Sequence, residues 1–241
     1  MEREVQLTDA CVELSGFHDR DFDEAAYARS LAARVIDLVD VDAAGVLLTR
    51  EGGHLEFAAA SAHAVKLLHT IELRFNDGPG VAGFRRGEVV TLPDVHDAQP
   101  WLAFRQAALR AGYHAVHVVP LRHQGEIVGT LTLFGRTPGP LAPDEQRIAL
   151  ALGTLAAAGL LTNRSLRKAE TLAGQLQTAL NSRIAVEQAK GILAERHGVS
   201  TERAFEVMRA FARRDRRKID EVARDVINDS PSVARLVTRA G

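Results

Sequence analysis

Residues 182–227 contain three apolar stripes at helical spacing, and these stripes constrain the fold more than any other feature of the chain. They consist, in chain order, of Ile184, Ala185, Ala189, Ile192 and Leu193, then Ala204, Phe205, Met208 and Ala212, then Ile219, Val222, Ala223, Val226 and Ile227. Gly198 predicts the end of the first helix, and Ser200 predicts the N-cap of the second. Because each helix has one apolar face, three such helices can bury their stripes against one another in a small all-α core. Ala189 and Ala204 are small residues within these stripes, so they are predicted to lie where two helices approach closely.

A dense basic run lies where the second predicted helix meets the third. Residues 209–218 hold six basic residues and one acidic residue, Asp215, so the local charge is +5 in a chain of formal net charge −1. The basic residues are Arg209, Arg213, Arg214, Arg216, Arg217 and Lys218. The ordinary interpretation of such a run is a solvated surface, and a binding site for a polyanion is the alternative.

Several short motifs follow one another through the same segment. They are Ser182-Arg183, Ala189 to Leu193, Gly198 to Ser200, Ala204-Phe205, Met208-Arg209, Lys218-Ile219 and Val222-Ala223. In this order they resemble the ANTAR domain of bacterial antitermination regulators. The resemblance implies a three-helix RNA-binding domain over residues 181–230, which holds a double-hairpin element of nascent RNA and prevents the terminator hairpin from forming. Arg216 stands where that family usually has Asn, and Ala212 stands where it often has Ser.

The resemblance and the charge together predict an RNA-binding surface. Basic side chains supply salt-dependent affinity for phosphate, and contacts to unpaired loop bases supply sequence choice. Arg183 and Lys190 are seven residues apart, so they share a helix face. The candidate RNA-binding residues are Arg183, Lys190, Arg209, Arg213, Arg214, Arg216, Arg217 and Lys218. Two alternatives stay open, namely DNA binding in the manner of a helix-turn-helix protein and docking of another signalling protein.

Residues 143–180 are predicted to form one long connecting helix, since no proline interrupts the chain from Asp144 to Leu180. Apolar and small residues follow alternating steps of four and three there, which is the a/d pattern of a coiled coil. The larger members of this pattern are the predicted seam of a parallel homodimer: Ile148, Leu152, Leu155, Leu166, Leu176 and Leu180. A helix that packs back on its own sheet is the alternative.

The N-terminal residues 22–142 mix strand and helix patterns without regular βαβ alternation. Segments 43–50, 54–61, 89–92, 114–121 and 127–134 are typical of strands, and segments 22–39, 62–70 and 81–86 of helices. This mixture predicts an antiparallel sheet with helices on its faces. The fold class expected for the whole chain is α+β, with a flanked antiparallel sheet, a long coiled-coil-like helix and a C-terminal all-α domain of three helices.

Four features of residues 22–142 resemble a GAF domain: the Asn76 to Gly80 loop, Val90 to Asp94, Trp101, and the stretch 112–134 with its paired strands. The resemblance implies a sensor domain with a pocket on one face of its sheet. Members of that family bind cyclic nucleotides, tetrapyrroles, haem or small metabolites, or only mediate dimerisation. Residues 22–142 lack cysteine, which argues against a thioether-linked bilin. The cofactor therefore stays unknown, and both a small-molecule effector and an empty pocket are expected possibilities.

The sequence offers no motif for catalysis. It contains no Walker loop, GxSxG, HExxH or metal-ligand cluster, so we expect that the protein is not an enzyme. The one cysteine, Cys11, lies in a predicted N-terminal extension, residues 1–21, which carries no apolar signal-peptide core. The longest nearly apolar run, 148–161, is too short to span a bilayer. We therefore expect a cytoplasmic regulator that ends in a tail, residues 231–241, and has RNA, a second copy and a small effector as partners.

Overall fold

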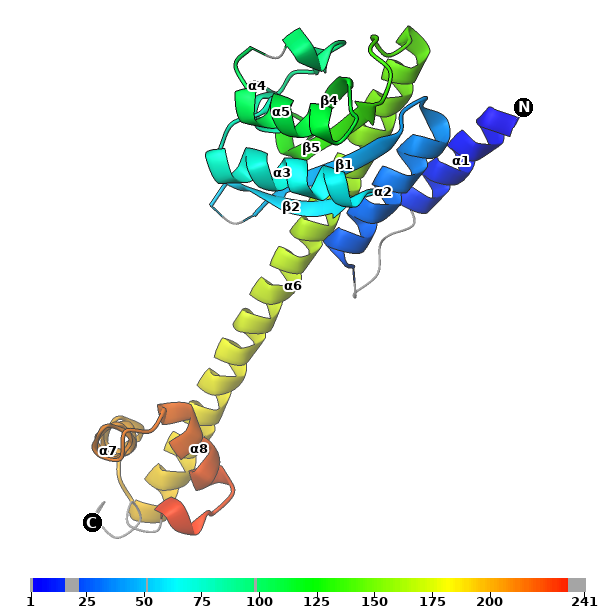
Figure 1. Cartoon of the computed structure of the whole chain (residues 1–241). Helices are drawn as coiled ribbons and strands as arrows, with labels where there is room; N and C mark the ends of the chain where they lie inside the picture. The colour runs from blue at the N-terminus through cyan, green and yellow to red at the C-terminus, as the bar shows by residue number, and fades with distance from the viewer. Residues whose placement is uncertain (1, 16–21, 51, 98, 234–241) are drawn as a thin grey trace. The chain divides into compact units, whose positions relative to one another are not determined.

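The computed structural model describes residues 2–15, 22–50, 52–97 and 99–233 (Figure 1). Residues 16–21 of the predicted extension and residues 234–241 of the predicted tail lie outside the described residues. The chain divides into two units, Met1–Leu166 and Arg167–Gly241, and each is described here by itself.

A five-stranded sheet of order β2-β1-β5-β4-β3 forms the centre of the first unit. The strands are β1 Ala43–Thr49, β2 Leu55–Ala60, β3 Val90–Leu92, β4 Ala115–His123 and β5 Glu126–Gly135. All neighbouring strands pair antiparallel, as the sequence predicts. Pro120 lies in β4 beyond Val118, where the short β3 no longer pairs, so its missing N–H breaks no ladder on that side.

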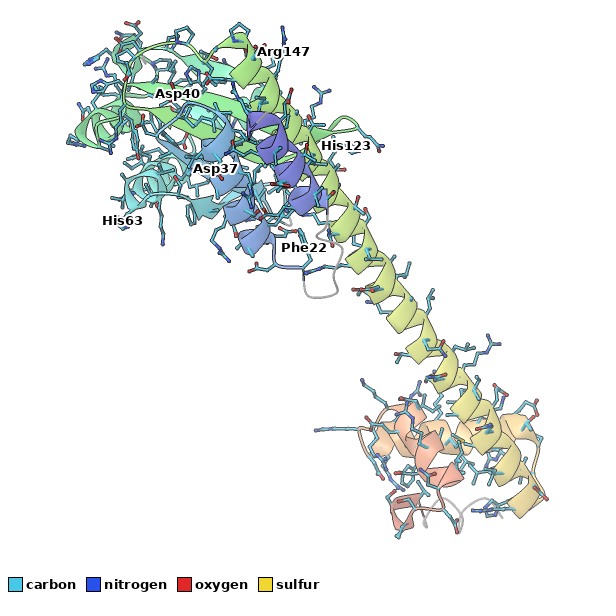
Figure 2. All side chains as sticks on the ribbon, turned by 90° about the vertical axis from the view of Figure 1, so that its right-hand side faces the viewer. Phe22, Asp37, Asp40, His63, His123 and Arg147 are labelled. Carbon is cyan, nitrogen blue, oxygen red and sulfur yellow. The ribbon has the colours of Figure 1, made fainter. Side chains whose placement is uncertain are left out.

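One face of the sheet is covered by α1 Glu2–Ser15, α2 Glu24–Leu38 and the first part of α6 Pro143–His197. Figure 2 shows α1 beside α2 and along α6. Ala10 and Leu14 of α1 are buried in this core, and the Tyr27 hydroxyl donates a hydrogen bond to the Leu14 carbonyl at 2.9 Å. The predicted extension thus contains a helix that packs as part of the sheet domain, with Cys11 exposed on it.

The opposite face is covered by α3 His63–Phe75, α4 Pro79–Arg86 and α5 Leu102–Arg110, with the short turn η1 Val95–Asp97 (Figure 1). Its core contains Trp101, Phe104, Tyr113 and Phe134. The motif 76–80 runs from the end of α3 into the first two residues of α4, so the sequence feature that carried the family resemblance is part of this face.

The connecting helix and the first helix of the C-terminal domain are one continuous helix, α6, of 55 residues. Leu152, which was predicted on a dimer seam, is fully buried in the core of its own sheet domain, so that prediction is wrong for this residue. Ile148 and Leu155 are partly buried against the same core. A Cβ on Gly159 would lie 2.5 Å from the Tyr27 hydroxyl oxygen, so the helix can pack this closely only without a side chain there. The first part of the predicted seam therefore follows the alternative interpretation and packs on its own sheet.

The later seam residues differ from the first three. Leu166, Leu176 and Leu180 are 45%, 62% and 53% exposed, although they are large and apolar. This part of α6 thus keeps an apolar stripe that nothing in the described chain covers.

The second unit packs the end of α6 against α7 Thr201–Arg214, α8 Ile219–Ile227 and the short turn η2 Pro231–Val233. Gly198, with φ of +62°, follows the end of α6, and the Ser200 hydroxyl accepts a hydrogen bond from the Arg203 N–H at 3.2 Å. Both signals were predicted from the sequence. Ala189 and Ala204 are buried, as expected for positions where helices approach closely. Within the described ranges of both units, no helix combines the length and apolarity that a bilayer crossing requires.

Candidate functional site

The basic run lies at the end of α7, in the loop that follows, and at the start of α8. Arg209, Arg213, Arg216 and Lys218, here called the junction cations, are all exposed. Among the described residues, none of the four has a carboxylate within ion-pair distance. The φ of Arg216 is 53°, a left-handed conformation that Asn tolerates better than Arg, which explains why the ANTAR pattern usually has Asn there.

Two other arginines of the run are held by neighbours. Arg214 pairs with Asp215 at 2.8 Å and lies over the Phe211 ring. Arg217 pairs with Asp225 of α8, and Asp225 also accepts a hydrogen bond from the Ser232 hydroxyl at 2.6 Å. Ser232 first, and Arg217 second, hold the pKa of Asp225 below its ordinary value. Arg217 therefore ties the α7–α8 loop to α8 and η2, and we place it outside the candidate interface.

The two candidates on α6 also differ from each other. Arg183 is exposed and has no carboxylate partner among the described residues. The Lys190 side chain is only 19% exposed, pairs with Glu187 at 2.9 Å and lies 5.6 Å from the centre of the Phe205 ring. Lys190 thus helps to join α6 to α7, while Arg183 is available to a partner.

A second group of polar residues lies beneath α3 in the sheet domain, and the sequence reasoning missed it. His69 and Glu72 are fully buried. His69 Nδ1 lies 2.8 Å from Glu72 Oε2, and Glu72 Oε1 accepts a hydrogen bond from the Gly80 N–H at 2.6 Å. Gly80 is the second residue of α4, so Glu72 caps the N-terminus of a helix whose own N-cap, Gly78, has no side chain. The signal in the sequence is the placement of two polar residues on the face of α3 that also carries Val65 and Leu68.

The motif 76–80 joins three helices. Asn76 ends α3 in a left-handed conformation with φ of 50°. Asp77 Oδ1 accepts hydrogen bonds from the Trp101 indole N–H, before α5, and from the Gly78 N–H, both at 3.1 Å. A Cβ on Gly78 would lie 2.5 Å from a Glu72 side-chain atom. The physical role of the motif is therefore to hold α3, α4 and α5 together.

Three buried polar atoms on this face lack a hydrogen-bond partner among the described residues: His69 Nε2, Thr130 Oγ1 and Thr132 Oγ1. Thr132 pairs directly with Gly45 across the sheet, and a Cβ on Gly45 would lie 2.3 Å from His69 Nε2. Buried polar groups are nearly always satisfied, so the three atoms have hydrogen-bonding capacity that the described residues leave unused. In the described residues, no group of three or more His, Cys, Asp or Glu side chains is arranged to bind a metal.

These features define an α+β domain in which the motif 76–80 holds three helices together on one face of the sheet. A small all-α domain with an exposed basic junction follows it. Family models agree with both parts: a GAF domain matches residues 23–160, and an ANTAR domain matches residues 174–227. The first match spans more than half of the chain, so the chain belongs to the GAF domain family and carries a C-terminal ANTAR domain. The GAF match extends past the predicted end at residue 142 into α6, where Leu152 is buried.

Solved structures support the fold of the first unit. The chain is similar to the GAF domain from a phosphoenolpyruvate-protein phosphotransferase of Coxiella burnetii, with a TM-score of 0.52, 18% identity, and coverage of 68% of this chain and 98% of that chain. It is also similar to the GAF domain from the Acinetobacter phosphoenolpyruvate-protein phosphotransferase, with a TM-score of 0.51, 12% identity, and coverage of 68% and 95%. At these identities the likeness concerns the fold alone. The comparison with curated proteins finds no match.

Proposed function

We propose that this protein is a signal-responsive transcription antitermination regulator that binds hairpin RNA through the α7–α8 junction. The observation that carries the proposal is the set of four exposed junction cations on the ANTAR domain, which have no carboxylate partner among the residues that the structure describes. RNA held by the protein cannot pair into a terminator stem, so binding favours continued transcription. The protein acts by binding, and we propose no catalytic step.

The charge pattern of the second unit supports this surface over a generic solvated one. Away from the junction, the arginines pair with carboxylates: Arg196 with Asp229 at 2.7 Å, Arg203 with Glu206 at 3.0 Å, and Arg224 with Asp220 at 3.1 Å. At the junction Arg214 and Arg217 are paired as well, whereas the four junction cations have no carboxylate within ion-pair distance in the part of the chain that the structure describes. Unpaired cations attract phosphate more strongly than paired ones, so the junction is the part of the unit best suited to RNA.

The proposal is tested with the full chain and three ligands: a hairpin RNA, the same RNA with scrambled loops, and duplex DNA of equal length. Arg209→Ala with Arg213→Ala removes two junction cations, while Arg203→Ala with Arg224→Ala removes two paired arginines and serves as the matched control. For two lost phosphate contacts, the slope of log affinity against log salt is expected to shrink by up to about 1.4, taking about 0.7 per contact for single strands. The control variant is expected to keep the wild-type slope.

Different outcomes separate the competing interpretations. Weaker binding of the loop-scrambled RNA supports readout of unpaired bases. Equal binding of all three ligands reduces the junction to a general polyanion surface and contradicts antitermination. Preference for duplex DNA favours the helix-turn-helix alternative, and equal loss of affinity in both double variants contradicts a site at the junction.

A second copy of the chain is the proposed partner of the exposed stripe on α6. Leu166, Leu176 and Leu180 keep the a/d spacing predicted from the sequence and are all exposed. Large apolar side chains at this spacing are stabilised by burial against an equivalent helix. The proposed dimer seam is thus restricted to the part of α6 that begins at Leu166.

The signal is proposed to be a small polar molecule bound between α3, α4 and the sheet. His69 Nε2, Thr130 Oγ1 and Thr132 Oγ1 provide buried groups with unused hydrogen-bonding capacity. Native mass spectrometry of the purified protein, compared with the Thr130→Val and Thr132→Val variants, tests this assignment. A molecule retained by the wild type and lost from both variants supports it, and a molecule retained equally by all three contradicts it.

A further inference from the structure

One arginine holds α6 against the sheet domain through hydrogen bonds to two different elements. Arg164 Nε and one of its terminal nitrogens donate to the two carboxylate oxygens of Glu24, at 2.8 and 2.9 Å. Its terminal nitrogens also donate to the Thr49 carbonyl at 2.9 Å and to the Thr49 hydroxyl at 3.1 Å. Glu24 is the first residue of α2 and Thr49 is the last residue of β1, so one guanidinium joins three elements.

The site is largely shielded from water, and its ion pairs extend to a second arginine. The side chains of Arg164 and Glu24 are 23% and 16% exposed. Glu24 also pairs with Arg50 at 3.3 Å, and Arg50 pairs with Glu56 of β2 at 3.2 Å. The planar guanidinium matches the carboxylate in a bidentate arrangement that a lysine cannot reproduce. The contact therefore has a defined geometry that sets the position of α6, beyond a general attraction of charges.

Arg164 lies where α6 changes from a buried to an exposed helix. Leu160 and Asn163, just before it, are buried, whereas residues 165–181 are all exposed. The boundary between the two units falls two residues after it, at Leu166. The position of α6 as it leaves the sheet domain is thus fixed at Arg164.

The same contact fixes which face of α6 stays free. At about 100° per residue, Leu166, Leu176 and Leu180 lie about 200°, 120° and 160° around the helix from Arg164. The proposed dimer seam is therefore on the face opposite the arginine. While Arg164 holds Glu24 and Thr49, the start of the seam points away from the sheet domain.

Strand β1 connects this contact to the opposite face of the sheet. Gly45, four residues before Thr49, lies beneath the His69 ring, and the Thr49 hydroxyl also donates to the Val128 carbonyl of β5 at 3.2 Å. A displacement of β1 caused by a molecule bound near His69 would move the Thr49 carbonyl that Arg164 holds. The strand is thus a short physical connection between the proposed effector face and α6.

We propose that Arg164 is a latch that sets the rotational position of α6, and that the signal received by the GAF domain controls RNA binding by closing or opening it. This inference rests on the proposed function, because its output is the affinity of the chain for RNA. The closed latch presents the seam to a second copy, and two joined copies bind one RNA more tightly than single copies do. Opening the latch lowers the affinity.

The test uses the full chain, with Arg164→Lys and Arg164→Ala as latch variants and Lys168→Ala as the control. Lys168 is exposed one helical turn further along α6, so its removal deletes a charge without touching the latch. Backbone amide exchange is measured over residues 161–168, together with affinity for the hairpin RNA. Both latch variants are expected to exchange faster in this segment and to bind RNA about fivefold or more weakly, the lower range of coupling between sites. Lys168→Ala is expected to match the wild type.

Each remaining outcome is decisive. If Arg164→Ala unfolds the sheet domain, Arg164→Lys and Glu24→Gln give the result instead. Unchanged exchange in the latch variants overturns the latch, as does faster exchange with wild-type RNA affinity. A wild-type chain that binds no hairpin RNA contradicts the proposed function and the latch together, whereas wild-type binding with no effect of the variants contradicts the latch alone.

Discussion

Replacement of Glu72 by Ala is expected to destabilise the GAF domain strongly, because the carboxylate satisfies two groups in a fully buried site. The Gly80 N–H and His69 Nδ1 would both lose their partner. Each buried group left unsatisfied costs about 1–3 kcal/mol, so the two together cost about 4 kcal/mol. In a domain of this size, 1 kcal/mol lowers the unfolding midpoint by about 2–4 °C, which gives an expected loss of about 8–16 °C.

Glu72→Gln is the matched comparison. Its amide oxygen still accepts from Gly80, and its amide nitrogen donates to the other tautomer of His69, so both contacts persist without the charge. Because neutral hydrogen bonds are weaker than charged ones, we expect a cost of about 1–2 kcal/mol. The difference between the two variants measures the hydrogen bonds separately from the charge.

Thermal unfolding is followed by tryptophan fluorescence, since the chain has one tryptophan, Trp101, and its indole N–H donates to Asp77 within the same motif. The signal thus reports on the region that Glu72 caps, and not on the ANTAR domain. A wild-type midpoint for Glu72→Ala would refute the capping role. Equal losses in the two variants would show that charge, and not the hydrogen-bond pattern, is what the site requires.

Two further predictions concern α6 and the second unit. Leu166→Asp with Leu176→Asp is expected to give monomers in sedimentation, because each substitution places a charge in the seam. Leu172 is an exposed leucine off the a/d pattern, so Leu172→Asp is expected to leave the dimer intact. A monomeric wild type would contradict the seam. Arg217→Ala is expected to lower the midpoint of the ANTAR domain, followed by helical circular dichroism. Arg213→Ala is expected to leave it unchanged, since of the two arginines it is Arg217 that forms ion pairs with α8 among the described residues. Because the Ser232 hydroxyl and Arg217 hold the pKa of Asp225 below its ordinary value, its contribution to stability is present above that ordinary value and is lost as the pH falls through the lowered pKa. A midpoint independent of pH in acid would contradict this network.

Elements that are marked by local sequence patterns, such as apolar runs, polar turns and helix caps, could be predicted from the sequence. The hairpin of β4 and β5 has apolar runs on both sides of a polar turn, and Ser200 caps α7 as expected. The continuity of α6 through the expected domain boundary at residues 180–181 could not be predicted in the same way. Asn181 and Ser182 are poor helix formers but do not break a helix, and the expected boundary there followed the limits of the resembled domain.

Candidate site residues were predictable as a charged run, but their pairing was not. Whether an arginine is unpaired depends on carboxylates that another helix brings to it, as Asp225 of α8 does for Arg217. The same limit applies to Arg164, whose partner Glu24 is 140 residues away in the sequence. Glu72 was missed for a different reason, because a carboxylate on an apolar helix face looks like a solvated residue until the N–H that it caps is known.

The core of the ANTAR domain has a consequence for the lifetime of the protein. Five of the eleven buried core residues that the structure describes there are alanine, so the helices lie close together but bury little apolar surface. A domain of this kind has a small margin of folding stability. RNA that binds only the folded domain adds to that margin, by about 2.7 kcal/mol when its concentration is a hundred times the dissociation constant. Under the proposed function, a bound transcript would then protect the protein from proteolysis, and the amount of intact protein would follow the supply of RNA.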